Sequence, residues 1–190
     1  TGSSKWSADI GLTLPSEGYQ YTAQIVSELN QLSSDLPAPF AKISEQSLPL
    51  LITSNGNQQA SSIKATLGQD VEFNGNLPHQ DMQFSRAHLV IGQSDLMGMG
   101  LGFSISANIP ELDVTPWYNV INTLINDLSD HQNKPLLEAP KRIFINAGNA
   151  LIASQRFTGL EMVAKNTSDS WLFDINAKET RMEVVLYKDW

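Results

Sequence analysis

The chain has 190 residues, with 20 acidic and 12 basic side chains, and its net charge is −8. An acidic chain repels phosphate backbones, which argues against nucleic-acid binding. The sequence also contains no run of Lys or Arg that could hold an anionic membrane surface. Cysteine is absent, which excludes disulfides, thiolate catalysis and Cys-based zinc sites.

Apolar and polar residues alternate strictly from Trp6 to Leu14, the period-2 pattern of a strand with one apolar face. The pattern returns along nearly the whole chain, and Asn55-Gly56 predicts a hairpin turn. The connections are short, so we expect antiparallel neighbours. The expected strands are 5–14, 19–29, 48–52, 63–67, 71–77, 82–91, 101–109, 141–147, 151–165, 171–177 and 182–187.

One stretch has a different period. Thr115 and Pro116 suit the start of a helix, and apolar residues then recur at helical spacing from Trp117 to Leu128. The pattern predicts one amphipathic helix near 116–130. A helix of about 15 residues is about 22 Å long and cannot cover ten strands spaced about 4.8 Å apart. The sheet must therefore curl on itself, pack on a second sheet, or leave a groove.

Motifs typical of catalytic and metal sites are weak. The glycines at 98–102 lead into a strand rather than a helix, so they favour a hairpin turn over a nucleotide loop. His79, His88 and His131 lack the spacing of a helical metal site, and Asp81 beside His79 fits an exposed turn. No Gly-x-Ser-x-Gly elbow is present, and Glu111 with Asp113 suits a helix start. We expect no enzyme activity, cofactor or metal.

Two proline segments carry a family resemblance. The run from Leu32 to Lys42, with Leu36-Pro37-Ala38-Pro39-Phe40 at its centre, is followed by Ser47-Leu48-Pro49-Leu50. In that order the segments resemble the YhdP branch of the AsmA-like envelope proteins. The run Ile109–Trp117 looks like that family's entry into a short helix, and Asp169–Ile175 looks like its recurrent Trp-containing strand. The resemblance spans roughly residues 5–187.

The resemblance implies an internal segment of a very large periplasmic protein of Gram-negative bacteria, anchored in the inner membrane by an N-terminal helix. Such proteins are similar to bridge-like lipid carriers whose sheets form a trough with an apolar floor. YhdP-like members are implicated in phospholipid movement toward the outer membrane. The family picture contains no enzyme activity and no cofactor.

Two functional hypotheses follow for residues 1–190, which we expect to form a single β-rich segment of a longer chain. The first is a segment of a phospholipid conduit, in which acyl chains lie on one-sided apolar strands. The second is a structural or protein-interaction module whose edges join neighbouring segments of the parent chain. The residues predicted to line a lipid groove are Ile10, Leu12, Leu50, Ile52, Phe73, Phe103, Ile105, Trp171 and Phe173.

Overall fold

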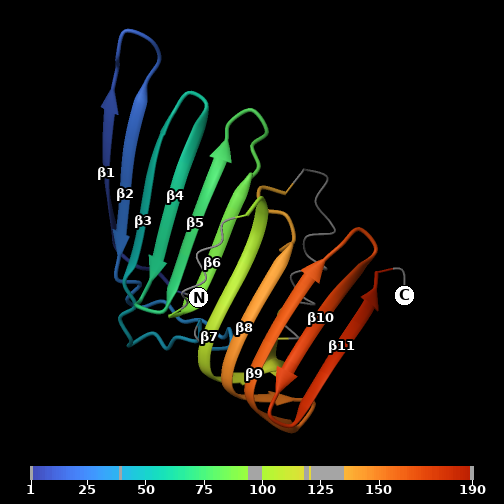
Figure 1. Cartoon of the computed structure of the whole chain (residues 1–190). Helices are drawn as coiled ribbons and strands as arrows, with labels where there is room; N and C mark the ends of the chain where they lie inside the picture. The colour runs from blue at the N-terminus through green and yellow to red at the C-terminus, as the bar shows by residue number, and fades with distance from the viewer. Residues whose placement is uncertain (1, 39, 94–99, 118–119, 121–134, 189–190) are drawn as a thin grey trace.

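Eleven strands form one sheet in which the order in space follows the order in the chain (Figure 1). The structure is a computed structural model that describes residues 2–38, 40–93, 100–117, 120 and 135–188. The strands are β1 (Trp6–Thr13), β2 (Gln20–Ser27), β3 (Leu50–Asn57), β4 (Ala60–Leu67), β5 (Val71–Pro78), β6 (Arg86–Gly92), β7 (Gly102–Asp113), β8 (Arg142–Ile152), β9 (Gln155–Asn166), β10 (Ser170–Ala177) and β11 (Thr180–Tyr187).

The sheet is mixed and is not closed into a barrel, which confirms the predicted mainly β, curled-sheet architecture. Eight of its ten neighbouring pairs are antiparallel. The other two pairs, β6–β7 and β7–β8, are parallel. The hairpin expected at the glycines 98–102 is therefore wrong, because a hairpin joins antiparallel strands whereas β6 and β7 run the same way. Of that segment, residues 98 and 99 lie outside the described residues.

The hairpin between β3 and β4 turns three residues later than predicted. Asn55 and Gly56 lie inside β3, and the turn falls at Gln58 and Gln59. The side-chain oxygen of Asn57 holds this turn by accepting hydrogen bonds from the N–H groups of Gln59 (2.8 Å) and Ala60 (3.2 Å). At Gly56 a Cβ would lie 2.9 Å from the Tyr21 ring, so glycine here permits a close approach rather than a turn.

Helical residues follow β7 at 114–117 and at 120. The Asp113 carboxylate accepts a hydrogen bond from the Thr115 N–H (3.0 Å), so Asp113 rather than Thr115 caps the first turn. The remainder of the helix expected near 116–130 lies outside the described residues. Within the described part of the chain, no helix combines the length and apolar character needed to cross a bilayer.

A long connection between β2 and β3 folds against one end of the sheet. Lys42 is buried there, and its ammonium donates to the carbonyls of Leu32 (2.6 Å) and Ile43 (3.1 Å). Phe40 packs edge-on against Trp117 with ring centroids 5.9 Å apart. Phe40 and Lys42 both belong to the proline segment identified in the sequence, and that segment thus ties the connection to the end of β7.

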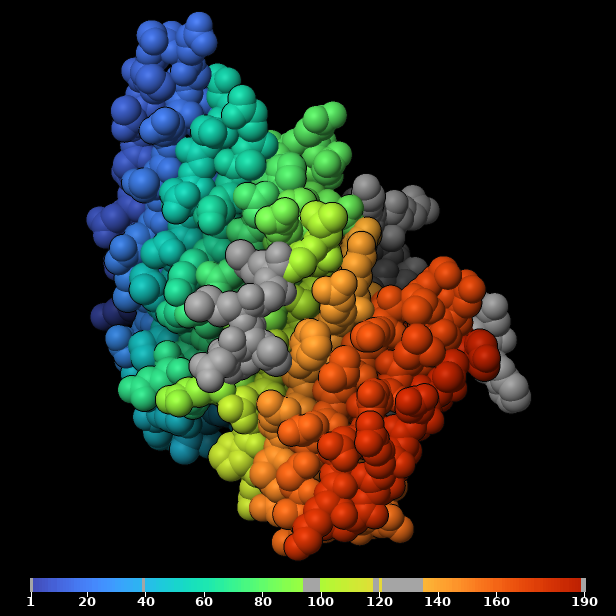
Figure 2. Space-filling model, in the orientation of Figure 1, coloured from blue at the N-terminus to red at the C-terminus, as the bar shows by residue number. Residues whose placement is uncertain are grey.

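The molecule is extended rather than compact. Its accessible surface is 13227 Å², whereas a compact protein of 20.9 kDa exposes about 9,000 Å². Figure 2 shows the strands following one another across the surface from the N-terminal to the C-terminal side. Among the described residues, the buried apolar side chains are Ala87, Ala107, Ala147, Ala150, Leu160 and Ala164. Over the residues that the structure describes, the sheet therefore buries no core of large apolar side chains beyond Leu160 and its neighbours.

Candidate functional site

The strand register places most of the apolar positions of the eleven strands on one face of the sheet, whereas Val26, Leu51, Val90, Phe144, Val163, Leu172 and Val185 lie on the other. Ile10 pairs with Ala23, Ile25 with Ile52, and Ala65 with Phe73, and paired residues point to the same side. The same register continues through β7 to β11, where Ile105 pairs with Ile143 and Phe173 with Val184. We call this side the apolar face and the other the polar face. Its larger members are Trp6, Ile10, Leu12, Tyr21, Ile25, Leu50, Ile52, Ile63, Leu67, Val71, Phe73, Leu77, Leu89, Ile91, Phe103, Ile105, Ile109, Ile143, Ile145, Leu160, Met162, Trp171, Phe173, Ile175, Met182, Val184 and Leu186.

The apolar face carries no charged strand residue over the region where the alternation runs unbroken. This region comprises β1 to β6, β10, β11 and the stretches 102–109, 142–147 and 160–166. Alternation places every charged residue of these strands on the polar face. Those residues are Asp9, Lys64, Glu72, Arg86, Arg142, Glu161, Lys165, Asp174, Arg181 and Glu183.

All nine residues predicted to line a groove lie on the apolar face. Ile10 and Leu12, on the edge strand β1, are 76% and 63% exposed. The other seven, on β3, β5, β7 and β10, are half-buried. The Trp171 and Phe173 rings stack with centroids 6.0 Å apart. The structure thus brings the nine residues onto one continuous surface, and their contact with lipid stays a prediction.

A hydrogen-bonded polar group interrupts the apolar face where β2, β3, β4 and β5 meet at their hairpin ends. The Tyr21 hydroxyl bonds the hydroxyls of Ser54 (2.9 Å) and Ser61. Ser61 lies 2.7 Å from His79 Nε2, and His79 Nδ1 lies 3.0 Å from the Gln58 carbonyl. The sequence reasoning assigned His79 to an exposed turn and missed this group, because its members are far apart along the chain.

A second Ser–His pair is buried on the polar face. His88 Nδ1 lies 2.7 Å from the Ser104 hydroxyl, and burial lowers the pKa of His88. His88 Nε2 is buried and has no hydrogen-bond partner. Neither Ser–His pair includes a carboxylate among the described residues, and Ser61 and Ser104 are only 5% and 8% exposed. These pairs hold strands together and lack the oriented carboxylate of a catalytic triad.

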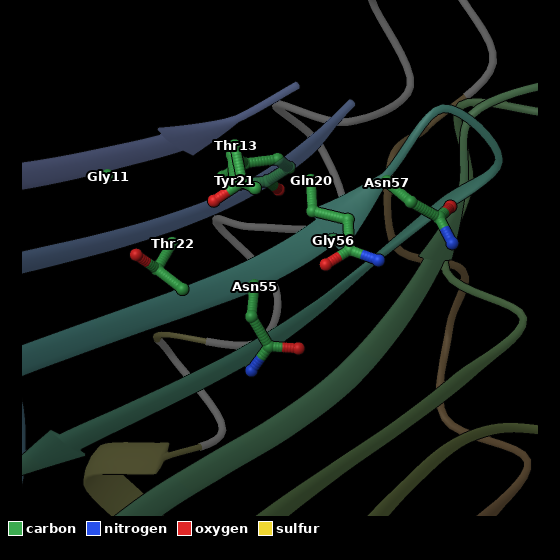
Figure 3. A pocket seen from close by; sticks show the side chains of 8 residues that line it. All are labelled: Gly11, Thr13, Gln20, Tyr21, Thr22, Asn55, Gly56 and Asn57. Carbon is green, nitrogen blue, oxygen red and sulfur yellow. The ribbon is translucent and has the colours of Figure 1, made fainter. Parts of the chain in front are cut away.

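The polar face near β1 to β3 has a shallow depression of about 370 Å³ (Figure 3). Gln20, Thr22, Asn55 and Asn57 bring amide and hydroxyl groups to it. Further along this face Lys64 forms an ion pair with Glu72 (2.9 Å). The hydrogen bond from Asn74 and the contact with Lys64 lower the pKa of Glu72. Around Lys64 and Glu72 this side of the sheet therefore has the character of an ordinary solvated surface, whereas Val163, Leu172 and Val185 line an apolar hollow over β9 to β11.

A cavity of about 650 Å³ lies where the β2–β3 connection meets the ends of β6 and β7. Its lining includes the apolar residues Ala38, Ile91 and Ile109 and the acidic residues Asp70 and Glu111. Ile91 and Ile109 belong to the apolar face, so the cavity continues that face toward the end that the connection covers. Metal-binding groups of three or more His, Asp or Glu are absent from the residues that the structure describes.

Fold and surface together define a class of protein: an open, one-layer β-sheet with one mainly apolar face and one mainly polar face. The family model described as YhdP protein matches residues 1–190, and the chain belongs to the YhdP family.

One relative is the intermembrane phospholipid transporter YhdP of Escherichia coli (strain K12). It is 22% identical to this chain over 181 residues. The match covers 94% of this chain and 14% of the relative, so the chain spans about a seventh of that protein's length. No solved structure matches the chain.

Proposed function

We propose that this chain is a non-enzymatic segment of a periplasmic phospholipid conduit, in which acyl chains slide along the apolar face. The parent chain would be anchored in the inner membrane of a Gram-negative envelope and would pass phospholipid toward the outer membrane. The observation that carries the proposal is the apolar face, which crosses all eleven strands and carries no charged strand residue wherever the alternation is unbroken. Membership of the YhdP family and the name of the Escherichia coli relative support lipid as the cargo.

The physical requirement for such a conduit is a surface that binds chains without holding them at one point. Each buried CH₂ contributes about 0.8 kcal/mol, so a chain lying across several strands is held by contacts that are individually weak. Half-buried side chains such as Ile52, Phe103 and Ile105 offer similar contacts on successive parts of the sheet. A lipid can therefore move from strand to strand without breaking any single strong interaction.

Photocrosslinking at neighbouring positions of β3 tests the proposal. Ile52 lies on the apolar face and Thr53 on the polar face, and both are half-buried. A photoreactive p-benzoyl-phenylalanine replaces one or the other, and the purified protein is irradiated with vesicles of phosphatidylethanolamine and phosphatidylglycerol. We expect lipid adducts by mass spectrometry from position 52 and none from position 53. The same comparison at Ile105 and Ser104 extends the test to β7.

The alternative hypothesis gives a different result in this experiment. If the sheet is a protein-interaction module, position 52 crosslinks to a second protein chain and not to lipid. Equal lipid adducts at positions 52 and 53 would show non-specific vesicle contact and would contradict the conduit.

A further inference from the structure

The polar group around Tyr21 lies on the same face of the sheet as the surface proposed to hold acyl chains. The register pairs its three strand residues with members of the apolar face: Tyr21 with Leu12, Ser54 with Ile63, and Ser61 with Leu77. Paired residues point to the same side. His79 follows β5 directly and bonds Ser61, so it reaches this side too. The group lies at the upper ends of β2 to β5 in Figure 1.

The hydrogen bonds of this group run in one direction when His79 is neutral. A carbonyl oxygen only accepts, so His79 Nδ1 carries the proton that the Gln58 carbonyl accepts (3.0 Å). Nε2 then has a lone pair, and Ser61 donates to it (2.7 Å). Because each hydroxyl has one proton, Tyr21 donates to Ser61 and Ser54 donates to Tyr21 (2.9 Å). The chain of donors therefore begins at Ser54, whose oxygen keeps its lone pairs but has no free proton.

Ser54 is the end of this chain that a ligand can reach. Its side chain is half-buried, whereas Ser61 in the middle of the chain is 5% exposed. The Tyr21 ring lies close to Gly56, where a Cβ would be 2.9 Å from it, and this position lets the hydroxyl reach β4. A ligand on the apolar face therefore meets the Ser54 oxygen as a hydrogen-bond acceptor, and the rest of the group holds it in that state.

The segments that join the strands at this end carry negative charge. The turns between β1 and β2 and between β3 and β4, and the segment from β5 to β6, include Glu17 and Asp81 and contain no Lys or Arg. The turn with Glu17 lies against the group, because a Cβ at Gly18 would be 3.0 Å from the Gln58 side chain. An acceptor beside acidic side chains favours a cationic donor and disfavours an anion. An ammonium group, with N–H donors and a positive charge, fits both features.

The opposite end of the same strands is apolar and covered. On β3 the apolar face runs from Ser54 to Leu50, which at about 3.3 Å per residue is about 13 Å. One acyl chain spans half of a bilayer's hydrocarbon core, about 15 Å. Beyond Leu50 the connection between β2 and β3 folds against the sheet, and a Cβ at Gly68 would lie 3.0 Å from the Leu48 side chain. The strand length therefore matches one lipid chain between a polar end and a covered apolar end.

We propose that the polar group around Tyr21 binds the ammonium headgroup of phosphatidylethanolamine, with Ser54 as the acceptor. The acyl chains extend from there over Ile52 and Ile63 toward the β2–β3 connection. The proposal rests on the conduit function and adds which end of the strands holds the headgroup and which headgroup is preferred. Choline carries the same charge but has no N–H donor, so phosphatidylcholine makes no hydrogen bond to Ser54.

Protonation of His79 reverses the chain of hydrogen bonds. Both ring nitrogens then donate, so Ser61 turns its proton to Tyr21 and Tyr21 turns its proton to Ser54. Ser54 uses one lone pair for Tyr21 and directs its own proton toward the ligand, so acidification should reduce the preference for an N–H donor. The charged residues of β1 to β5 point to the polar face. The other titratable side chains on the adjoining segments are Glu17, Tyr19 and Asp81. These act alike on two zwitterionic lipids of the same charge.

Calorimetric titration with soluble probes tests the site. The probes are dihexanoyl-phosphatidylethanolamine, dihexanoyl-phosphatidylcholine and phosphoethanolamine, which has the headgroup without the chains. The test variant is Ser54→Ala. The matched control is Ser62→Ala, the same substitution on the polar face of β4, the neighbouring strand. Thermal unfolding checks that every variant folds.

We expect the natural chain to bind the ethanolamine lipid about fivefold more tightly than the choline lipid at pH 7.5, the effect of about one hydrogen bond. Ser54→Ala should bind the two lipids equally, and Ser62→Ala should keep the preference. Tyr21→Phe should also lose most of the preference although it retains Ser54, because that hydroxyl is then free to turn its proton outward. At pH 5.5 the preference of the natural chain should fall, whereas His79→Gln should show the same ratio of affinities at both pH values.

The remaining outcomes separate this site from the conduit. Equal affinity of the natural chain for the two lipids at pH 7.5, or a preference that survives Ser54→Ala, overturns the headgroup site and leaves the conduit in place, because the chains still bind. Failure of both lipids to bind the natural chain overturns the conduit and, with it, this site. Phosphoethanolamine binding as tightly as the lipid would overturn a lipid as the ligand. A natural-chain preference that is the same at both pH values would overturn the direction assigned to the hydrogen bonds.

Discussion

The edge strand β1 and the inner strand β9 have similar alternating sequences but very different burial. Ile10 on β1 is 76% exposed, whereas Leu160 on β9 is 1% exposed, although both point to the apolar face. Leu160 has a paired strand on each side and lies in a cluster with Ala147 and Ala150. The comparison shows that alternation decides which face a side chain occupies. The position of the strand in the sheet, at an edge or inside, decides how deeply that side chain is buried.

The inner strands also differ from the edge in the size of their buried side chains. Of the six buried apolar residues in the described part of the chain, five are alanines and Leu160 is the exception. Alanine buries little area, so the hydrophobic contribution of this centre is small. The ladder of backbone hydrogen bonds and the half-buried large residues around it must therefore hold the sheet. This arrangement leaves the large side chains of the apolar face available to a ligand.

Among the described residues, Leu160 is the one large apolar side chain that is buried, and removing it should have the largest effect. Leu160→Ala leaves a cavity beside Ala147 and Ala150, and we expect the free energy of unfolding to fall by about 3 kcal/mol. Ile10→Ala, on the same face but on the edge, should cost less than about 0.5 kcal/mol. Urea unfolding followed by circular dichroism measures both. Equal losses from the two variants would show that β1 is buried as deeply as β9.

Two glycines with similar backbone φ angles separate the cost of backbone strain from the cost of a steric clash. Gly92 at the end of β6 and Gly159 in β9 have φ angles of 75° and 61°. A Cβ at Gly92 would collide with the Asn108 backbone carbonyl, whereas a Cβ at Gly159 would have no atom within 4 Å. We expect Gly159→Ala to cost about 1 kcal/mol from strain alone. Gly92→Ala should cost roughly 1–3 kcal/mol more because backbone must move.

The same urea titrations test the glycine pair, with the natural chain as reference. Similar losses at Gly92 and Gly159 would mean that Asn108 moves away freely, and that the end of β6 is not held against β7 as the register indicates.

The buried histidine of β6 should make stability depend on pH. Burial lowers the pKa of His88, so the unfolded chain, with a histidine pKa of about 6.5, binds a proton more readily than the folded one. The free energy of unfolding should therefore fall as the pH drops below about 6.5. The residues opposite His88, Asn74 and Ser104, carry no titratable group that would offset this effect.

Thermal unfolding of the natural chain and of His88→Gln between pH 7 and pH 5 measures the contribution of His88 to the pH dependence of stability. Carboxylates contribute equally to both proteins, so the natural chain should lose more stability on acidification than the variant. Parallel pH profiles would mean that His88 becomes protonated in the folded state at no cost.

Strand identity and the division into two faces could be predicted from the sequence, because period-2 alternation follows from backbone geometry. The direction of β7 could not, since an alternating pattern reads the same both ways. The turn at Ala153 and Ser154 was also missed, and 151–165 was predicted as one strand. Both residues have positive φ angles, 49° and 65°, yet neither is a residue type that favours such a turn.

The candidate site likewise has one part that the sequence could predict and one part that it could not. The nine predicted lining residues share a face because each strand's pattern is local. The polar group around Tyr21 depends on pairing between distant segments, because pairing sets which residues meet.

The smallest expected effect belongs to the polar face. Lys64 and Glu72 form an ion pair of 2.9 Å across β4 and β5, but their side chains are 50% and 40% exposed. An exposed pair contributes little because water screens the attraction and both side chains lose rotamer freedom. We expect Lys64→Gln with Glu72→Gln to change the free energy of unfolding by less than about 0.5 kcal/mol. A double-mutant cycle measures the coupling energy between Lys64 and Glu72. A coupling energy well above 1 kcal/mol would mean that this ion pair is shielded from water, which would contradict the assignment of this side of the sheet as the solvated face.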